Sequence, residues 1–230
     1  MITNNQKGFT LVEIAIVLVI IGLLLGGILK GQELINSARV RNLADQNSGI
    51  QAAYYGFIDR YRQVPGDWSG SAATTAIGVT VIGGNGNSRI DNTTEEASAV
   101  WAQLAKSNFI GGGFEPATTA TGDSATYRTA APLNAFNGVL TLTRNDAYAG
   151  TANTRLNLHL GNNVPVSIAR ELDVKLDDSK PNTGVLRLGA TDTEFSTIHG
   201  IGGTCATATD STGEFDIAGD GQDCGQVFLY

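Results

Sequence analysis

The residues with the clearest chemistry lie near the start of the chain, in the sequence KGFTLVE at residues 7–13. A short polar leader ends at Gly8, and an apolar run interrupted only by Glu13 follows at once. A secretory signal peptide carries its apolar region before the cleavage site and loses it on processing. Here the plausible cut, between Gly8 and Phe9, precedes the apolar run. The processed chain is therefore expected to keep that run.

Glu13 places a carboxylate in this apolar segment, which costs about 2–3 kcal/mol or more in a membrane unless the charge is paired. A cut before Phe9 would create an α-amine four residues away. That amine could pair with Glu13 of the same chain or of a neighbouring chain, and the second arrangement would hold two helices in one axial stagger. A carboxylate that reaches water at the membrane edge explains Glu13 equally well. The spacing leaves both interpretations open.

A second pair of reactive groups, Cys205 and Cys224, lies far along the chain. An even pair of cysteines in an exported chain predicts a disulfide, and a loop of about 20 residues makes it worth about 3 kcal/mol. Two free thiols or a metal-binding pair are the alternatives. The chain has only two histidines, His159 and His199, and no CxxC spacing, which favours the disulfide.

Several aspartates are weaker candidates for a calcium site, because carboxylate oxygens in Gly- and Asn-rich turns can hold that ion. The candidates are Asp91 in the segment 83–91, Asp177 and Asp178 close after Asp173, and Asp216, Asp220 and Asp223 close to Cys224. Ordinary solvated turns explain all three groups better, so no cofactor is expected. His159 falls at the outward position of an alternating segment and is expected on the surface, and His199 lies in a Gly-rich loop.

The apolar run itself, residues 11–29, is long enough to span a membrane. Its nineteen residues would extend about 28 Å as a helix, close to the thickness of a bilayer core. Gly22, Gly26, Gly27 and Gly31 cluster in and just after it. Each interior glycine costs about 1 kcal/mol of helix stability, so the helix is expected to bend most easily there.

The helical pattern continues beyond the membrane stretch. Apolar residues recur at steps of three and four up to Tyr61, and Pro65-Gly66 then ends the pattern. A helix over residues 9–62 would be about 80 Å long. Its first half is apolar on every side and its second half has one apolar stripe, which predicts that a globular head packs against the second half.

The remaining residues predict a mixed head. Loops are expected at 66–92 and 115–132, a helix with a Thr93–Glu96 capping box and Trp101 as a core residue is expected to end at 111–113, and a second helix is expected at 165–176. Strands are expected at 139–143, 155–160 and 184–188. An apolar run closes the segment at 227–230.

The string GFTLVE followed by the apolar helix resembles the N-terminal signature of type IV prepilins and type II secretion pseudopilins. The resemblance implies cleavage between Gly8 and Phe9 by a prepilin peptidase, N-methylation of Phe9, and a Glu13 that complements the Phe9 amine of an adjacent subunit. It implies a leader in the cytoplasm and a head in the periplasm, where the cysteines can oxidise. Many pilins carry a helix-kinking proline after the membrane stretch, and this chain has Lys30 in that region.

Together these features predict an α+β, pilin-like lollipop, in which a long N-terminal helix packs against a head with an antiparallel sheet and short helices. The expected organisation is a cleaved leader (1–8), a transmembrane and filament-core half-helix (9–29), an amphipathic half-helix (30–64) and a periplasmic or extracellular head (65–230). The segments around 172–184 also resemble the heads of some prepilin-like proteins, although that likeness is diffuse.

The function expected from the resemblance is that of a structural subunit in a type IV pilus-type filament. A type II secretion pseudopilin, or a minor pilin that starts assembly or presents an adhesive head, is the alternative. The partners implied are other pilin-like subunits, the prepilin peptidase and methyltransferase, and the inner-membrane assembly machinery. The protein would sit in a bacterial inner membrane by one helix and then move to a pilus or pseudopilus.

Two other functional classes find little support in the residues. The net charge is −7, and loss of residues 1–8 with their single lysine makes it −8, which argues against direct binding of nucleic acid by the head. The sequence shows no nucleophile elbow, no metal-spaced His or Cys set and no phosphate loop after a strand. An enzyme is therefore not expected.

Overall fold

The computed structural model describes residues 10–78, 80–117, 127–192, 194–195, 198–199, 205–208 and 210–230. A long N-terminal helix is followed by short helices and a four-stranded antiparallel sheet, so the predicted α+β class is confirmed. The chain divides into two compact units, residues 1–39 and residues 40–230.

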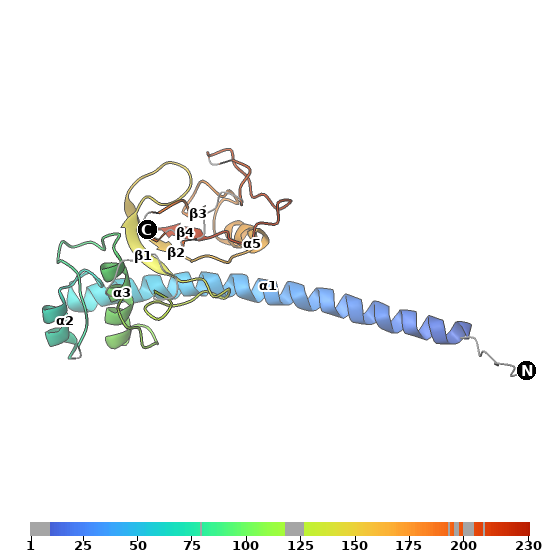
Figure 1. Cartoon of the computed structure of the whole chain (residues 1–230), viewed down its shortest axis with the longest axis horizontal. Helices are drawn as coiled ribbons and strands as arrows, with labels where there is room; N and C mark the ends of the chain where they lie inside the picture. Colours follow the sequence, from blue (N-terminus) through green and yellow to red (C-terminus); the bar gives the residue numbers. More distant parts are fainter. Residues whose placement is uncertain are drawn as a thin grey trace, which may run out of the picture. The chain divides into compact units, whose positions relative to one another are not determined.

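Helix α1 runs without a break over Leu11–Tyr61, including the glycine-rich stretch, and confirms the long helix expected from the sequence (Figure 1). It stops just before Pro65-Gly66, as predicted, and Arg62 already has a left-handed φ of 55°. Gly66 follows with a φ of 91°. A Cβ atom there would lie 2.5 Å from Val100 Cγ2, so this turn requires glycine.

The second half of α1 contributes one stripe of side chains to the core of the larger unit. The buried members of the stripe, which recur at helical spacing, are Val40, Leu43, Ile50, Ala53 and Phe57. The Phe57 ring contacts rings from beyond the helix, with centroid distances of 6.0 Å to Trp68 and 5.9 Å to Phe109. The amphipathic pattern therefore gives the head a helical spine, as expected.

The sheet consists of β1 (Thr141–Asn145), β2 (Arg155–His159), β3 (Leu186–Leu188) and β4 (Gln226–Leu229). Its order is β1-β2-β4-β3, with antiparallel pairing throughout. Three of these strands overlap the predicted ones. The fourth, β4, includes most of the apolar run noted at 227–230 and lies between β2 and β3, which explains why all four of its residues are buried.

Among the described residues the head has three further helices: α2 (Gly70–Ile77), α3 (Thr94–Lys106) and α5 (Val166–Leu176). The last confirms the helix expected at 165–176, with Pro165 as its N-cap. The prediction that residues 66–92 form only loop is wrong, because α2 lies within them. Its sequence, GSAATTAI, is too short and too small in its side chains to show a clear apolar face.

Helix α3 begins where the sequence predicts but ends earlier. The Thr93 hydroxyl accepts a hydrogen bond from the Glu96 amide, as in a capping box, while the Glu96 carboxylate accepts from the amides of Asn85 and Asp91 instead of from Thr93. The helix ends at Lys106, because Asn108 takes the left-handed conformation (φ 63°) that was expected of the glycines at 111–113.

The core of the larger unit joins α1, α3, α5 and the sheet. Trp101 is fully buried in it, as predicted. Tyr230 fastens the end of the sheet to the spine, since its hydroxyl donates to Asn47 Oδ1 at 2.6 Å. Residues 115–132 were expected to be exposed. Within them 118–126 lie outside the described residues, while Ala117, Tyr127, Ala130 and Ala131 are buried, so the prediction is wrong for these four.

Candidate functional site

The start of α1 holds the first candidate group. The backbone amide and the hydroxyl of Thr10 both donate to Glu13 Oε2 at 2.8 Å, and the Glu13 amide donates back to Thr10 Oγ1 at 3.3 Å. This reciprocal arrangement caps the first turn of the helix. No described residue donates to the second carboxylate oxygen, Oε1, which remains available to a further donor.

The apolar side chains that follow are open to their surroundings. Every described side chain from Thr10 to Lys30 is exposed, including Leu11 at 87%. By length and composition this part of α1 is suited to cross a membrane, and no part of that apolar window is buried within the protein itself. A soluble fold does not leave such a surface open, because exposed apolar patches of this size mark a membrane or another protein.

Residues 3–29 match the family model described as the prokaryotic N-terminal methylation motif. The chain carries the prepilin-type signature. The match covers the seam between Gly8 and Phe9, Glu13 and the apolar run, so the resemblance stated from the sequence is confirmed. Neither the curated proteins nor the solved structures include a significant match to the chain.

The processing residues of this prepilin-type N-terminus, Gly8 and Phe9, lie outside the described residues. The cut between them and the methylation of Phe9 therefore remain predictions from the motif. Thr10 is the residue that sequence reasoning did not single out. A Thr three residues before a Glu is the ordinary signal of a helix N-cap, and it could have been noticed on that ground.

The predicted disulfide is confirmed in the head. Cys205 and Cys224 are bonded, with a Cα–Cα distance of 5.7 Å, and both residues are fully buried. The Cys224 amide donates to the carbonyl of Val164, just before α5. The disulfide thus ties the segment that leads into β4 to the rest of the head.

The calcium candidates are each engaged locally and do not converge. Among the described residues there is no group of three or more His, Cys, Asp and Glu side chains that could hold a metal ion. Asp91 accepts from Asn85, Asn87 and Arg89, which closes the turn at 85–91. That local use favours the ordinary turn over a metal site.

The other five candidates show the same behaviour. Asp177 accepts from the amides of Val185 and Leu186, and Asp178 from the Lys180 amide and the Thr183 hydroxyl. Asp216 accepts from the Gly219 amide, Asp220 from the Gln222 side chain, and Asp223 from the Asn163 amide. These bonds organise turns, and turns of this kind need no metal.

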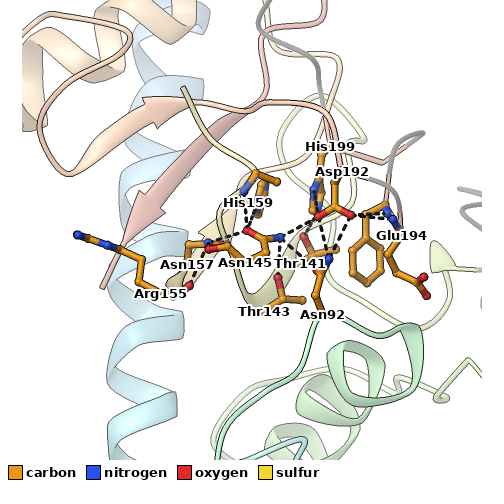
Figure 2. Close-up of polar contacts among 12 residues, drawn as sticks. Asn92, Thr141, Thr143, Asn145, Arg155, Asn157, His159, Asp192, Glu194 and His199 are labelled. Atoms are coloured by element: carbon orange, nitrogen blue, oxygen red, sulfur yellow. Dashed lines mark hydrogen bonds and ion pairs between the residues drawn. The ribbon is translucent and has the colours of Figure 1, made fainter. Parts of the chain in front are cut away.

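A second candidate site was not foreseen: a buried cluster of polar side chains in the head (Figure 2). At its centre the carboxylate of Asp192, only 4% exposed, accepts bonds from the side chains of Asn92 and Asn145 and from the amides of Glu194 and Phe195. The donor distances run from 2.7 to 3.2 Å. The hydrogen-bonding capacity of this buried carboxylate is thereby satisfied by groups of the head itself.

The two histidines lie in this cluster, one on the other. Their rings are parallel within 7°, with centroids 3.5 Å apart, and the residues are only 1% (His159) and 2% (His199) exposed. The prediction that His159 lies on the surface is wrong. The face of β2 that would be outward is covered by the segment that carries Asp192 and His199, so alternation in the strand did not reveal it.

The histidines are held as neutral rings. Burial lowers the pKa of His199 to about 3, and burial followed by the neighbouring His199 lowers the pKa of His159 well below its usual value, although Asp192 opposes this. His199 Nε2 and Thr141 Oγ1 share a hydrogen bond of 2.5 Å. His199 Nδ1 lies 3.8 Å from Asp192 Oδ2, beyond hydrogen-bonding distance, and because the ring is neutral this contact is not an ion pair.

Thr141, His199 and Asp192 are residue types found together in nucleophilic catalysis, but their placement argues against that chemistry. All three are at least 96% buried, since Asp192 is the most exposed of them at 4%, and a substrate could not reach the hydroxyl. The 3.8 Å separation also leaves the imidazole without the orienting bond that such a triad needs. The cluster therefore joins segments of the head and does not form an active site.

Proposed function

We propose that this protein is a structural subunit of a type IV pilus-type helical filament. The observation that carries the proposal is an exposed apolar helix with one carboxylate in its first turn, inside a segment that matches the methylation motif. In a membrane the apolar surface contacts lipid. In a filament the same surface contacts the apolar helices of other subunits, which replace the lipid.

Processing supplies the trigger for assembly in this proposal. Cleavage between Gly8 and Phe9 creates an α-amine, and N-methylation keeps its positive charge. Glu13 of an adjacent subunit receives that amine through Oε1, the oxygen that Thr10 leaves unused. A pair of opposite charges in an apolar filament core is worth more than in water, and it fixes the axial stagger between two subunits.

The division of the chain follows from this role. Residues 1–8 are the cleaved leader, 9–29 form the membrane and filament-core half of the helix, 30–64 the amphipathic half, and 65–230 the head. The head faces the periplasm before assembly and the outside of the filament after it. The partners are other pilin-like subunits, the prepilin peptidase and methyltransferase, and the inner-membrane assembly machinery.

The same N-terminus would serve a type II secretion pseudopilin or a minor pilin that starts assembly or displays an adhesive head. The abundance of the subunit separates these roles. Surface filaments sheared from cells and examined by electron microscopy and mass spectrometry contain this chain as their bulk component if it is a major pilin. Traces of the chain in filaments built of another subunit would instead identify a minor pilin.

The decisive test of the proposal is the intact mass of the protein purified from its native membrane. We expect a chain that begins at a singly methylated Phe9. The matched control is a Gly8→Glu variant, which should retain residues 1–8 because the small residue before the cut is lost. A wild-type chain that retains its leader, or a cut within or after the apolar run, would overturn the assignment.

We propose further that the head needs no metal ion, because its candidate aspartates are already used in turns. Thermal unfolding with EDTA and with millimolar calcium should give the same midpoint. A calcium-dependent rise of several degrees, lost in an Asp177→Asn or an Asp216→Asn variant, would contradict this and would locate the site.

A further inference from the structure

The stacked histidine pair connects three parts of the head that are distant in sequence. His159 comes from β2, Thr141 from β1, and His199 from the segment that also carries Asp192. Asn145 of β1 binds Asp192 at 2.9 Å, and Asn92, just before α3, binds it at 3.1 Å. Asp192 and His199 are therefore held to the sheet by buried polar contacts, and Asp192 is held to the start of α3 by part-buried ones.

We propose that the His159–His199 stack is an acid-sensitive fastening, in which protonation of either imidazole releases the residues around Asp192 from β1, β2 and the start of α3. This inference goes beyond the filament role and does not depend on it. It assigns the head a response to the pH of its surroundings.

The geometry leaves no room for a charged imidazole in the closed state. Two rings 3.5 Å apart cannot both carry a positive charge, and a proton on either one faces a buried, aromatic neighbour. Phe195 covers His199 with a centroid distance of 5.2 Å. A charged group in such surroundings must be paired or exposed to water, and exposure requires that the stack opens.

The carboxylate of Asp192 faces His199, but its oxygens already accept hydrogen bonds from other residues. Its Oδ1 accepts from Asn92 and from the amides of Glu194 and Phe195, and its Oδ2 accepts from Asn92 and Asn145. A proton on His199 Nδ1 would find Oδ2 at 3.8 Å and would have to displace an amide donor to bind it. Formation of an ion pair in place of this network would itself rearrange the fastening.

Among the residues that the structure describes, the other titratable or charged groups around the stack do not neutralise it. The carboxylate of Glu194 accepts from the amide and hydroxyl of Thr94 and points away from the rings, and the Arg155 guanidinium at the start of β2 also points away (Figure 2). Tyr127 contacts Phe195 and stays neutral, because burial raises the pKa of its hydroxyl. β4 faces His159 with the apolar Val227 in register.

The expected size of the effect follows from the proton affinity of an open imidazole. If a released histidine regains the ordinary pKa of 6.5, a change from pH 7.5 to pH 5.0 multiplies the opening equilibrium about 30-fold for one ring. Release of both rings would give about a thousandfold increase. At pH 7.5 even a released imidazole is mostly uncharged, so little free energy is gained by opening and the fastening stays closed.

Amide hydrogen exchange of the full chain in detergent micelles tests this proposal. The reporters are the amides of Glu194 and Phe195, which donate to Asp192. The control amides, Ser107 and Phe109, donate to the backbone carbonyls of Gln103 and Leu104 and therefore to no titratable group. After correction for chemical exchange rates, the reporters should open between about 30-fold (one ring released) and about a thousandfold (both rings) more at pH 5.0 than at pH 7.5, and the controls should stay within about twofold.

A double variant, His159→Phe with His199→Gln, keeps a ring on β2 and a polar partner for Thr141 but cannot be protonated. It should lose the acid response of Glu194 and Phe195. Imidazole ¹⁵N chemical shifts of the wild-type chain give a second readout that needs no variant: both rings should remain neutral at pH 6. Equal reporter protection at the two pH values, ordinary titration of both rings without opening, or an acid response that survives in the double variant would each overturn the proposal.

Discussion

Two carboxylates show how differently the two units of this chain treat a charge. Glu13 is exposed, lies on an apolar helix surface and has one oxygen that no described residue uses. Asp192 is 4% exposed and accepts from four different residues of the head. The first unit leaves the Glu13 Oε1 acceptor and a large apolar surface exposed. In the second unit, hydrogen bonds from the protein occupy both oxygens of Asp192. Recognition of other subunits is therefore expected in the first unit and rigidity in the second.

Removal of the exposed carboxylate of Glu13 tests the difference between the two units most directly. Glu13→Val should spare membrane insertion, because the helix becomes more apolar, but reduce incorporation into filaments by about tenfold or more, since about 1.4 kcal/mol of pairing energy corresponds to a factor of ten. Quantitative blots of sheared filaments against total membrane measure this.

The matched control for that experiment is Glu33→Gln. Glu33 makes an exposed ion pair with Lys30 on the same helix, so its loss should leave assembly near the wild-type level. Incorporation of Glu13→Val at the wild-type level would show that the open oxygen has no role in assembly.

Removal of the buried carboxylate of Asp192 should instead lower the stability of the head. Asp192→Ala leaves the side chains of Asn92 and Asn145 and two buried amides without their acceptor, and we expect a loss of about 3–5 kcal/mol in the free energy of unfolding. Chemical denaturation monitored by tryptophan fluorescence measures it. Asp210→Ala is the control, because that exposed carboxylate also accepts from a backbone amide and a hydroxyl, both of Thr212, yet its loss should shift the midpoint much less.

Loss of the disulfide should have the next largest effect on the stability of the head. Replacement of Cys205 and Cys224 by serine opens a loop of about 20 residues and should cost about 3 kcal/mol of head stability. The wild-type chain in reducing agent should show a similar loss, and the double variant should no longer respond to the reducing agent. Full stability after reduction would mean that the surrounding core holds β4 without the bond.

Asp173 offers a contrast to Asp192 within the head. Its carboxylate is also buried, but its oxygens have no hydrogen bond of good geometry. Burial, followed by the nearby Asp177 and Asp178, raises the pKa of Asp173 to about 7, although the amides of Ser179 and Lys180 approach the carboxylate and oppose the shift. The folded state thus keeps its proton up to about pH 7, while the unfolded state releases it near 3.8. Stability from this group is present below pH 4 and is lost as the pH rises towards 7.

Asp173→Asn should accordingly stabilise the head by about 1–2 kcal/mol at pH 8 and have little effect at pH 4. Thermal unfolding at the two pH values measures the difference. The sign is opposite to that of the histidine pair, whose contribution is lost as the pH falls below 6.5. A variant that is less stable than the wild-type chain at pH 8 would show that the ionised carboxylate has a partner in solution.

The sequence predicted the elements whose patterns are long or regular. Helix α1 follows from a continuous apolar run joined to a stripe, β1 and β2 from alternation, and α5 from a proline followed by apolar residues at helical spacing. The signature at residues 7–13 depends on residue identity alone, so no fold was needed to find Glu13.

The elements that were missed depend on tertiary contacts. The rule that alternating strand residues face solvent assumes one open face, but the end of β2 is covered on both sides, and His159 is buried as a result. The covering segment has no period of its own, so nothing in its sequence shows that Asp192 and His199 meet the sheet. Likewise α2 has no apolar face, and the role of β4 becomes clear only when β2 and β3 lie on either side of it.

The position of β4 has a consequence for the order of events during export. Among the described strands, β3 pairs only with β4, and β4 pairs with β2, which precedes it by about 70 residues. In the exported chain that we propose, the sheet stays incomplete until residues 226–229 have crossed the membrane. At that stage the helix is already in the membrane, although the sheet still lacks β4. The disulfide between Cys205 and Cys224 can form only after Cys224, just before β4, has been exported. In the role that we propose, a subunit that still lacks β4 therefore has an incomplete sheet while its helix is already in the membrane.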